Sequence, residues 1–311
     1  MKILALKVET MDRVNGFIDV DKLLNIPRKE IYDVTKLLKF LLKNNNTVVV
    51  CKRRMNSQFV LRFDYNGETY YFKFDSFVNP YNELIFYYLA SDMEINSLSY
   101  DLAKLGVYEG VISKNFKKNG VKYILGGEIL NRYHGEYMYG MYNNLEDIWA
   151  DLEEYFKDRS DMQEVVAKLM DKLVRIFIFD LLIGQEDRHP DNWGIVEYPN
   201  GEVDLQINLD NSRALVDHPI MVRHKLRMNN DDLYAEDMIE NFQKVSSDEF
   251  SSVLPSYLWV ISKENILKTF AKIEEQTGVP MPEELKNEYL RKFEIYYDFF
   301  DDLLSDLRTG R

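Results

Sequence analysis

The stretch that decides the fold runs from residue 181 to residue 194, and its sequence is Leu181-Leu182-Ile183-Gly184-Gln185-Glu186-Asp187-Arg188-His189-Pro190-Asp191-Asn192-Trp193-Gly194. It begins at the end of a long apolar segment and leads into a second apolar pair, Ile195 and Val196. Polar residues this dense between two apolar segments are typical of a loop at the mouth of a cleft. We therefore expect this loop to carry functional side chains.

Three oxygen-bearing side chains in and after this loop are suited to phosphoryl transfer. Asn192 follows Asp187 by five residues, and Asp210 follows the apolar-rich run 203–209. Phosphoryl transfer needs a carboxylate that orients the acceptor hydroxyl, and it needs oxygen ligands for Mg²⁺. The pattern favours Asp187 for the first role and Asn192 and Asp210 for the second. Taken singly, each aspartate could instead be an ordinary turn residue.

A lysine between aromatic residues is the second candidate. Strands are predicted for 59–65 and 69–75, with an Asn-Gly turn between them, and Lys73 lies in the second strand. A buried lysine is costly unless it is paired or bound to an anion. Glu83 lies ten residues later, in the first turn of a helix predicted for 80–90. The alternative is a lysine that extends along the surface into solvent.

These segments resemble the HipA-like serine/threonine kinases, and in particular the stand-alone members of that family. The resemblance rests on Leu-Leu-Ile-Gly, Asp-Arg-His-x-x-Asn and Asn-Trp-Gly within 181–194, and on Asn82-Glu83 opening a helix that ends in Leu89-Ala90. Phosphatidylinositol 3- and 4-kinases share the Asp-Arg-His-x-x-Asn core. The resemblance covers about residues 47–217 and implies an ATP- and Mg²⁺-dependent kinase.

The resemblance also assigns individual roles. Asp187 is implied as the catalytic aspartate, with Asn192 and Asp210 as metal ligands. Lys73 is implied to bind the ATP phosphates, with Glu83 as its partner. Two neighbours in the loop are expected to be structural: Arg188 by pairing with a carboxylate, and His189 by supporting the loop. Asp191 is expected to face solvent.

Two further stretches would complete an ATP site. The phosphate loop falls on residues 53–58, which contain no glycine, so Asn56, the Ser57 hydroxyl and backbone N–H groups would have to meet the phosphates. This departure from a glycine-rich loop puts ATP affinity in doubt, although HipA-like kinases also lack the usual glycine pattern. HipA itself suggests autophosphorylation at Ser57. The adenine pocket is assigned to the predicted hinge from Ser113 to Phe116.

The order of predicted elements gives an α+β, bilobal protein-kinase-like fold, with a small β-rich N-lobe and a larger helical C-lobe. Residues 1–46 form an N-terminal extension with one helix predicted for 27–41, which begins at Pro27. Residues 47–116 form the ATP-binding β lobe, and residues 117–311 form the helical lobe with the catalytic and metal-binding loops. Strands are predicted for 107–115 and 122–125, with a turn between them.

Composition limits the partners. The net charge of −13 disfavours nucleic acid and anionic membranes as partners. No apolar stretch reaches the roughly 20 residues of a membrane-spanning helix. The single cysteine, Cys51, fits a reducing compartment, so a cytoplasmic location is expected, and secretion as an effector is left open.

Two alternatives to a protein kinase remain at this point. The shared loop also fits a lipid or small-molecule kinase, and the glycine-free phosphate loop also fits a nucleotide-binding pseudokinase. The resemblance implies a protein substrate with a Ser or Thr acceptor. It also allows an antitoxin or other regulatory partner.

Overall fold

The computed structural model describes residues 13–24, 43, 49–54, 58–75, 79–129, 145–185, 188, 192–206, 214–215, 223–225, 232–234 and 254–309. The chain divides into two compact units. The first comprises Met1–Tyr88, Leu98–Phe116 and Thr269–Pro282, and the second comprises Leu89–Ser97, Lys117–Lys268 and Glu283–Arg311. Each unit is described by itself below.

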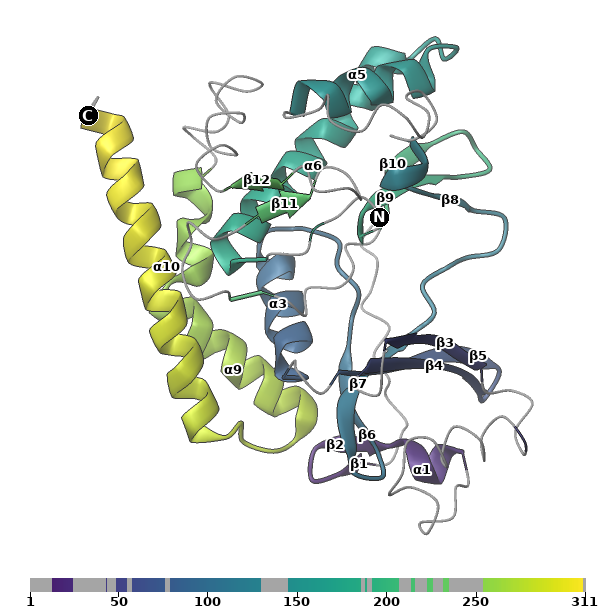
Figure 1. Ribbon diagram of the computed structural model, residues 1–311, viewed down its shortest axis with the longest axis vertical. Helices are drawn as coiled ribbons and strands as arrows, with labels where there is room; N and C mark the ends of the chain where they lie inside the picture. Colours follow the sequence, from purple (N-terminus) through teal and green to yellow (C-terminus); the bar gives the residue numbers. More distant parts are fainter. Residues whose placement is uncertain are drawn as a thin grey trace. The chain divides into compact units, whose positions relative to one another are not determined.

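The first unit is built on a seven-stranded sheet with the order β1-β2-β6-β7-β5-β4-β3 (Figure 1). Its strands are β1 (Arg13–Val14), β2 (Phe17–Asp19), β3 (Val49–Arg54), β4 (Gln58–Tyr65), β5 (Glu68–Asp75), β6 (Asp101–Leu105) and β7 (Tyr108–Lys114). All neighbouring strands are antiparallel except β2 and β6, which are parallel. A short helix, α1 (Val20–Leu23), follows β2.

The hairpin of β4 and β5 forms as its sequence predicts. Asn66 and Gly67 both have positive φ, 52° and 79°, as a two-residue turn between right-twisted strands requires. Alternate residues of β4 and β5 are buried in one apolar cluster, to which Phe59, Leu61, Phe63, Tyr70 and Phe72 belong. The two-residue period therefore turns Lys73 toward the opposite face of β5.

Residues 13–24 contribute to the same cluster. Ile18, Val20 and Leu24 are buried in it, and β2 extends the sheet beyond β6. The sequence assigns these residues to an N-terminal extension and gives no strand for them or for β6, because all three strands are short and lack a clear apolar alternation. The helix predicted for 27–41 lies outside the described residues.

Helix α3 (Tyr81–Asp92) follows β5 and is apolar around most of its circumference. Leu84, Ile85, Phe86 and Leu89 are fully buried, which is typical of a helix enclosed on all sides. Helix α9 (Lys263–Thr277) leads into a turn whose Thr277 and Val279 lie against Gly16 of the β1–β2 turn. Both helices contribute residues to each of the two units.

The second unit is mainly helical. Its long elements are α5 (Leu145–Phe156), α6 (Met162–Ile183) and α10 (Glu283–Thr309), with a 3₁₀ helix, η4 (Leu258–Ile261). Its strands form a sheet of β8 (Lys122–Leu125), β9 (Gly194–Glu197) and β10 (Val203–Leu205), and a pair of β11 (Arg223–Lys225) and β12 (Asp232–Tyr234). Every residue of α6 from Ile176 to Ile183 is buried.

The strands predicted for 107–115 and 122–125 are both present, with a turn at Asn119 and Gly120 between them. In the structure β7 belongs to the seven-stranded sheet, whereas β8 pairs with β9. The lysine-rich turn between them therefore links two sheets, which the local sequence alone could not indicate.

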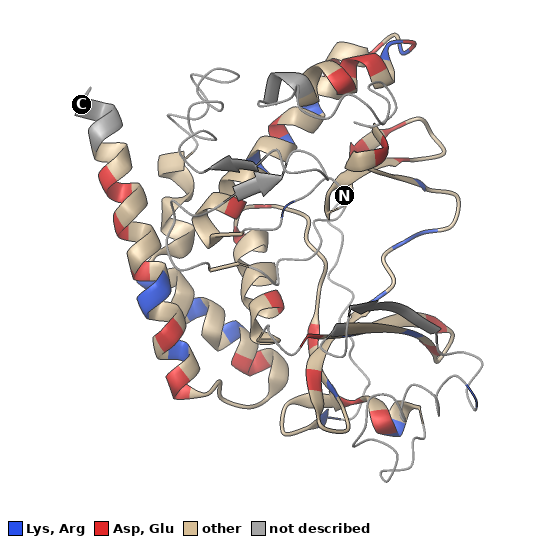
Figure 2. Ribbon diagram, in the orientation of Figure 1, with Lys and Arg blue, Asp and Glu red and all other residues tan. Residues whose placement is uncertain are grey.

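Charged residues lie mainly on exposed positions. In the first half of α10, basic residues lie among acidic ones (Figure 2), and Lys292 pairs with Glu288 one turn away. Pairs of this kind favour helix formation by a few tenths of a kcal/mol, about 0.2–0.5 each. Within the described part of the chain, no helix is both long and apolar enough to span a membrane.

Candidate functional site

The first predicted pair, Lys73 and Glu83, is in contact. The Nζ atom of Lys73 donates a hydrogen bond of 2.9 Å to Oε1 of Glu83. The lysine side chain is 15% exposed and the glutamate side chain 2% exposed, so the pair is largely withdrawn from water. The amine that remains partly exposed could meet an anion.

The strand that carries Lys73 is held from both sides. Lys73 pairs with Val60 of β4 and with Val111 of β7. Next to Val111, Gly110 lies so close to the Lys73 carbonyl oxygen that a Cβ atom at Gly110 would overlap it. A residue with a side chain there would push β5 and β7 apart. Gly110 thus helps to fix the position of Lys73.

The second feature is a fully buried ion pair that anchors the polar loop. Arg188 donates from Nε to Oδ2 of Asp180 and from Nη2 to Oδ1, both at 2.8 Å, and both side chains are 0% exposed. A third hydrogen bond, from Arg188 Nη1 to the backbone oxygen of Asn192, measures 3.3 Å. Two parallel bonds fix a guanidinium against a carboxylate in one orientation. The loop is therefore attached to the last turn of α6.

The chain enters the loop through a tight helix end. Gly184 follows α6 with φ of 62° and ψ of 45°, a left-handed conformation that glycine adopts without strain. The N–H of Gln185 then donates to the oxygen of Asp180 at 2.8 Å. A Cβ atom on Gly184 would overlap the buried ring of Tyr296 in α10. Both the backbone conformation and the packing thus require glycine here.

The chain leaves the loop through a second close contact. Trp193 is buried, and its carbonyl oxygen accepts a hydrogen bond of 2.9 Å from the N–H of Gly126. A Cβ atom on Gly194 would overlap the carbonyl oxygen of Ile124 in β8. The Trp-Gly end of the motif therefore lets β9 lie against β8.

The segment that carries Asp210 is tied at both ends to this loop region. The N–H of Gln206 donates to the oxygen of Gly194 at 2.9 Å, just after the loop. The N–H of Leu215 donates to the oxygen of Ile183 at 2.7 Å, just before the loop. Gln206 and Leu215, the described residues before and after the segment, thus lie beside the two ends of the loop.

Solved structures that resemble this chain include a bacterial kinase and a protein of a toxin–antitoxin system. The Helicobacter pylori proinflammatory kinase CtkA matches with a TM-score of 0.54 and 16% sequence identity, covering 78% of this chain and 94% of CtkA. HipA of Shewanella oneidensis MR-1, in its complex with HipB and operator DNA, matches with a TM-score of 0.53 and 14% identity, covering 88% of this chain and 69% of HipA. The chain has the fold of the HipA-like kinases. No protein-family model matches its sequence, and no characterised sequence does.

The resemblance inferred from the sequence is thus confirmed for the fold. Within the HipA-like fold, the structure describes six of the predicted site residues: Lys73, Glu83, Ser113, Phe116, Arg188 and Asn192. The other predicted site residues, Asn56, Ser57, Asp187, His189 and Asp210, lie outside the described residues. Their roles stay predictions.

Asn192 and Ser113 have well-defined surroundings. Asn192 is only 9% exposed, and its backbone oxygen accepts a hydrogen bond from Arg188. Ser113 is buried in β7, and the N–H of Asn115 donates to Thr69 at 2.8 Å. Any adenine contact from this predicted hinge would therefore use other backbone groups, such as those of Phe116.

The residue types present fit Mg²⁺ and ATP. Amide and carboxylate oxygens, as on Asn192, Asp187 and Asp210, are the ligands that Mg²⁺ prefers. A lysine held by a buried carboxylate suits a phosphate chain. Among the described residues, no group of three or more His, Cys, Asp or Glu side chains could hold a metal ion.

Two residues that hold the site were missed by the sequence interpretation. Asp180 is visible only as a break in the apolar run 173–184, and Gly110 is one glycine in a predicted strand. A carboxylate in an otherwise apolar helix does call for a cationic partner. Gly110 gives a weaker signal, since a glycine within a strand often marks the close approach of another backbone.

Proposed function

We propose that this protein is an ATP-dependent phosphotransferase of the HipA type, with a bilobal kinase fold, that transfers the γ-phosphoryl group of ATP to a Ser or Thr hydroxyl of a protein. The observation that carries the proposal is the Lys73–Glu83 ion pair, present in a chain with the HipA-like fold. The proposal also includes the catalytic role expected for Asp187, which lies in the loop that Arg188 anchors.

The proposed roles follow from the chemistry of each side chain. Lys73 binds the phosphates, and Glu83 keeps its ammonium group in place. Asp187 accepts a hydrogen bond from the acceptor hydroxyl and orients it. Asn192 and Asp210 would hold Mg²⁺, which when bound neutralises charge on the transferring phosphoryl group. In this proposal Ser57, Asn56 and the stretch from Ser113 to Phe116 complete the nucleotide contacts.

The contacts around the loop support the roles of Asp187 and Asp210. Asp187 precedes the buried Arg188 by one residue, so the ion pair limits where its backbone can lie. The segment that contains Asp210 starts and ends at hydrogen bonds beside the same loop. Phosphoryl transfer gains most of its rate from groups that are held in place before the reaction, and that is the role we propose for these contacts.

The decisive experiment is a phosphotransfer assay on the purified full chain with labelled ATP, with and without Mg²⁺. We expect Mg²⁺-dependent hydrolysis and autophosphorylation by the parent. Asp187→Ala should abolish transfer and leave ATP binding largely intact, because the carboxylate acts on the acceptor rather than on the nucleotide. Asp191→Ala is the matched control, since it removes a carboxylate from the same loop at a position expected to face solvent.

Equal transfer by Asp187→Ala and the parent would refute the mechanism. Binding of ATP without any transfer by the parent would favour the pseudokinase alternative. A panel of acceptors, comprising Ser/Thr peptides, inositides and small hydroxylated molecules, separates a protein kinase from a lipid or small-molecule kinase. Mass spectrometry of the product tests Ser57 as an autophosphorylation site.

The cellular setting is part of the same proposal. The HipA neighbour belongs to a toxin–antitoxin system and was crystallised with HipB and operator DNA. A regulatory protein partner for this chain is proposed on that analogy. The net charge of −13 argues against direct binding of nucleic acid. We place the protein in the cytoplasm, in keeping with its single cysteine.

A further inference from the structure

The second unit contains a pocket that the kinase proposal does not use. It has a volume of about 290 Å³ and is lined by α6, by β10 and by the turn of residues 94–96 that follows α3. Ile176, its lining residue on α6 nearest to the loop, lies eight residues before Gly184, or about 12 Å along the helix. None of the lining residues belongs to the polar loop, although Gln206 contacts Gly194 at the end of that loop. Its volume suits a small molecule.

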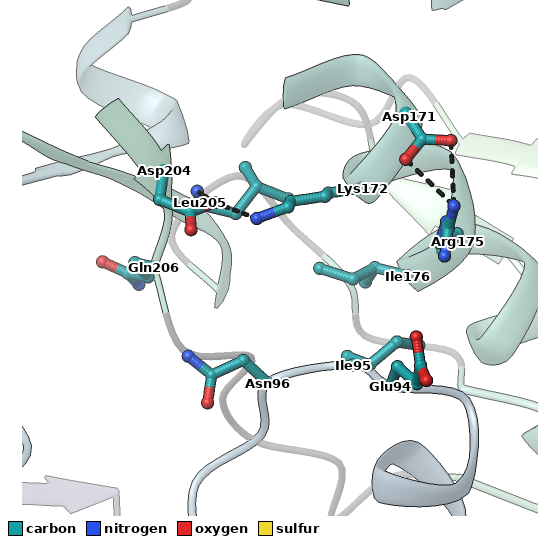
Figure 3. A pocket seen from close by; sticks show the side chains of 10 residues that line it. All are labelled: Glu94, Ile95, Asn96, Asp171, Lys172, Arg175, Ile176, Asp204, Leu205 and Gln206. Carbon is teal, nitrogen blue, oxygen red and sulfur yellow. Dashed lines mark hydrogen bonds and ion pairs between the residues drawn. The ribbon is translucent and has the colours of Figure 1, made fainter. Parts of the chain in front are cut away.

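The pocket has an apolar side and a polar side (Figure 3). Ile95 and Ile176, 8% and 4% exposed, supply apolar surface on one side. The amides of Asn96 and Gln206 lie on the other side in this view. A ligand that fits both sides needs an apolar body and a polar end.

Gln206 supplies the strongest sign that a ligand is missing. Its side chain lines the pocket and is only 4% exposed. Among the described residues, its Nε2 group is one of few buried polar groups without a hydrogen-bond partner. A buried donor without an acceptor is costly, and native proteins rarely retain one without a reason. A carboxylate or carbonyl oxygen on a ligand would satisfy it.

The charges on the rim indicate what else the ligand carries. Lys172 pairs with Asp204, and Arg175 pairs with Asp171 at 3.2 Å. These four side chains are 29–41% exposed, so the pairs are weak enough to exchange partners. Glu94 adds a third carboxylate, and three acidic against two basic residues give the lining a formal charge of −1. This balance disfavours a simple anion and suits a molecule with both a carboxylate and an ammonium group.

We propose that this pocket binds a small zwitterion with an apolar body, of the α-amino-acid class. Its carboxylate accepts hydrogen bonds from Gln206 Nε2 and Lys172. Its ammonium group, on the same carbon as the carboxylate, lies toward Asp204 beside Lys172, and its apolar side chain contacts Ile95 and Ile176. The proposal stands on the pocket alone and does not depend on the proposed kinase activity.

The test uses the full chain without ATP, with L-leucine and L-phenylalanine as probes, and isothermal titration calorimetry together with saturation-transfer NMR as readouts. We expect saturable binding of at least one of the two amino acids. Two analogues each lack one charge: 4-methylpentanoate has no ammonium group, and leucinol has no carboxylate. Each should bind at least about tenfold more weakly than leucine, because each leaves part of the polar rim unpaired.

Variants give a second, independent test. Gln206→Met keeps the side-chain length but removes the donor, and it should weaken binding about tenfold. Lys122→Met, which removes an exposed lysine from β8 outside the pocket, should bind like the parent. Asp187→Ala should also bind the amino acids like the parent, which would show that binding at this pocket does not need the catalytic aspartate.

Three results would overturn the proposal. The first is no binding of either amino acid at about 10 mM, a concentration far above the dissociation constant expected for a built site. The others are binding of leucinol or 4-methylpentanoate as tight as that of leucine, and unchanged leucine binding by Gln206→Met. If that variant fails to fold, the comparison of leucine with its two analogues on the parent still decides the matter.

Discussion

Replacing Arg188 by methionine would leave the carboxylate of Asp180 buried in the last turn of α6 without its two 2.8 Å hydrogen bonds to the guanidinium. Both side chains are 0% exposed, so water cannot take over the role of the lost partner. Breaking a pair of this kind costs about 3–5 kcal/mol, which is roughly two to nearly four powers of ten in the folding equilibrium. We expect Arg188→Met to lower the free energy of unfolding by about that amount.

The complete experiment is a double-mutant cycle measured by urea denaturation. Asp180→Leu alone should also be strongly destabilising, because it leaves a buried guanidinium unpaired. The double variant, Asp180→Leu with Arg188→Met, should have a free energy of unfolding within about 1–2 kcal/mol of the parent's, since apolar side chains often replace a buried ion pair with little loss of stability. Lys157→Met, which breaks an exposed ion pair with Glu154 on α5, is the control and should change stability little.

The activity of the double variant separates two roles of the pair. Arg188 also bonds the backbone of Asn192, so its loss frees the loop even where the fold is retained. We expect phosphotransfer by the double variant to stay reduced about 100-fold, because small displacements of catalytic groups have effects of that size. The contrary result is that Arg188→Met lowers the free energy of unfolding by less than about 1 kcal/mol, with no coupling to Asp180→Leu in the cycle. That result would show that the pair neither stabilises the fold nor anchors the loop.

Three further predictions follow from the described contacts. Lys73→Met should lower phosphotransfer about 100-fold and also destabilise the fold, because it removes the ammonium partner of the buried Glu83 carboxylate. Adding Glu83→Gln should restore the stability but not the phosphotransfer. Restored phosphotransfer would contradict the role of Lys73. Gly184→Ala should cost about 2 kcal/mol or more in urea denaturation, from its left-handed backbone and the overlap with Tyr296; a neutral effect would disprove that packing. Burial raises the pKa of Asp101 despite the hydrogen bond from Arg13. Its contribution to stability is therefore full below the unfolded pKa of about 3.9 and is lost as the pH rises through the folded pKa. Asp101→Asn should lose less stability than the parent as the pH rises above about 4, and an unchanged pH profile would contradict this.

Local signals in the sequence predict much of the fold and part of the site. The Asn-Gly turn and the alternation of 59–75 predict the β4–β5 hairpin, and the long apolar segment before the polar loop belongs to α6. The expected contact between Lys73 and Glu83 and the expected pairing of Arg188 with a carboxylate are both present. In each case the signal is local, because charged residues in apolar surroundings imply a partner.

What the sequence could not indicate depends on contacts between distant segments. β2 joins the sheet through parallel pairing with β6, more than 80 residues away, and neither strand has an alternating pattern. β8 pairs with β9 across about 70 residues, and the sequence predicts no partner for it. Gly110 becomes informative only once the register of β5 and β7 is known. Periodicity describes which face of a segment is buried, but not which segment covers it.

Two parts of the candidate site are built in the same way. In each, a cation is withdrawn from water and paired with a carboxylate eight or ten residues away on another element. In each, a glycine lets a second backbone or a ring approach closely, Gly110 at the Lys73 pair and Gly184 at the Arg188 pair. Apolar residues could replace such pairs with little loss of stability, so stability alone does not account for them. What they provide is a fixed position for one amine and for one polar loop, which is the requirement of a reaction that depends on placing charges rather than on covalent chemistry.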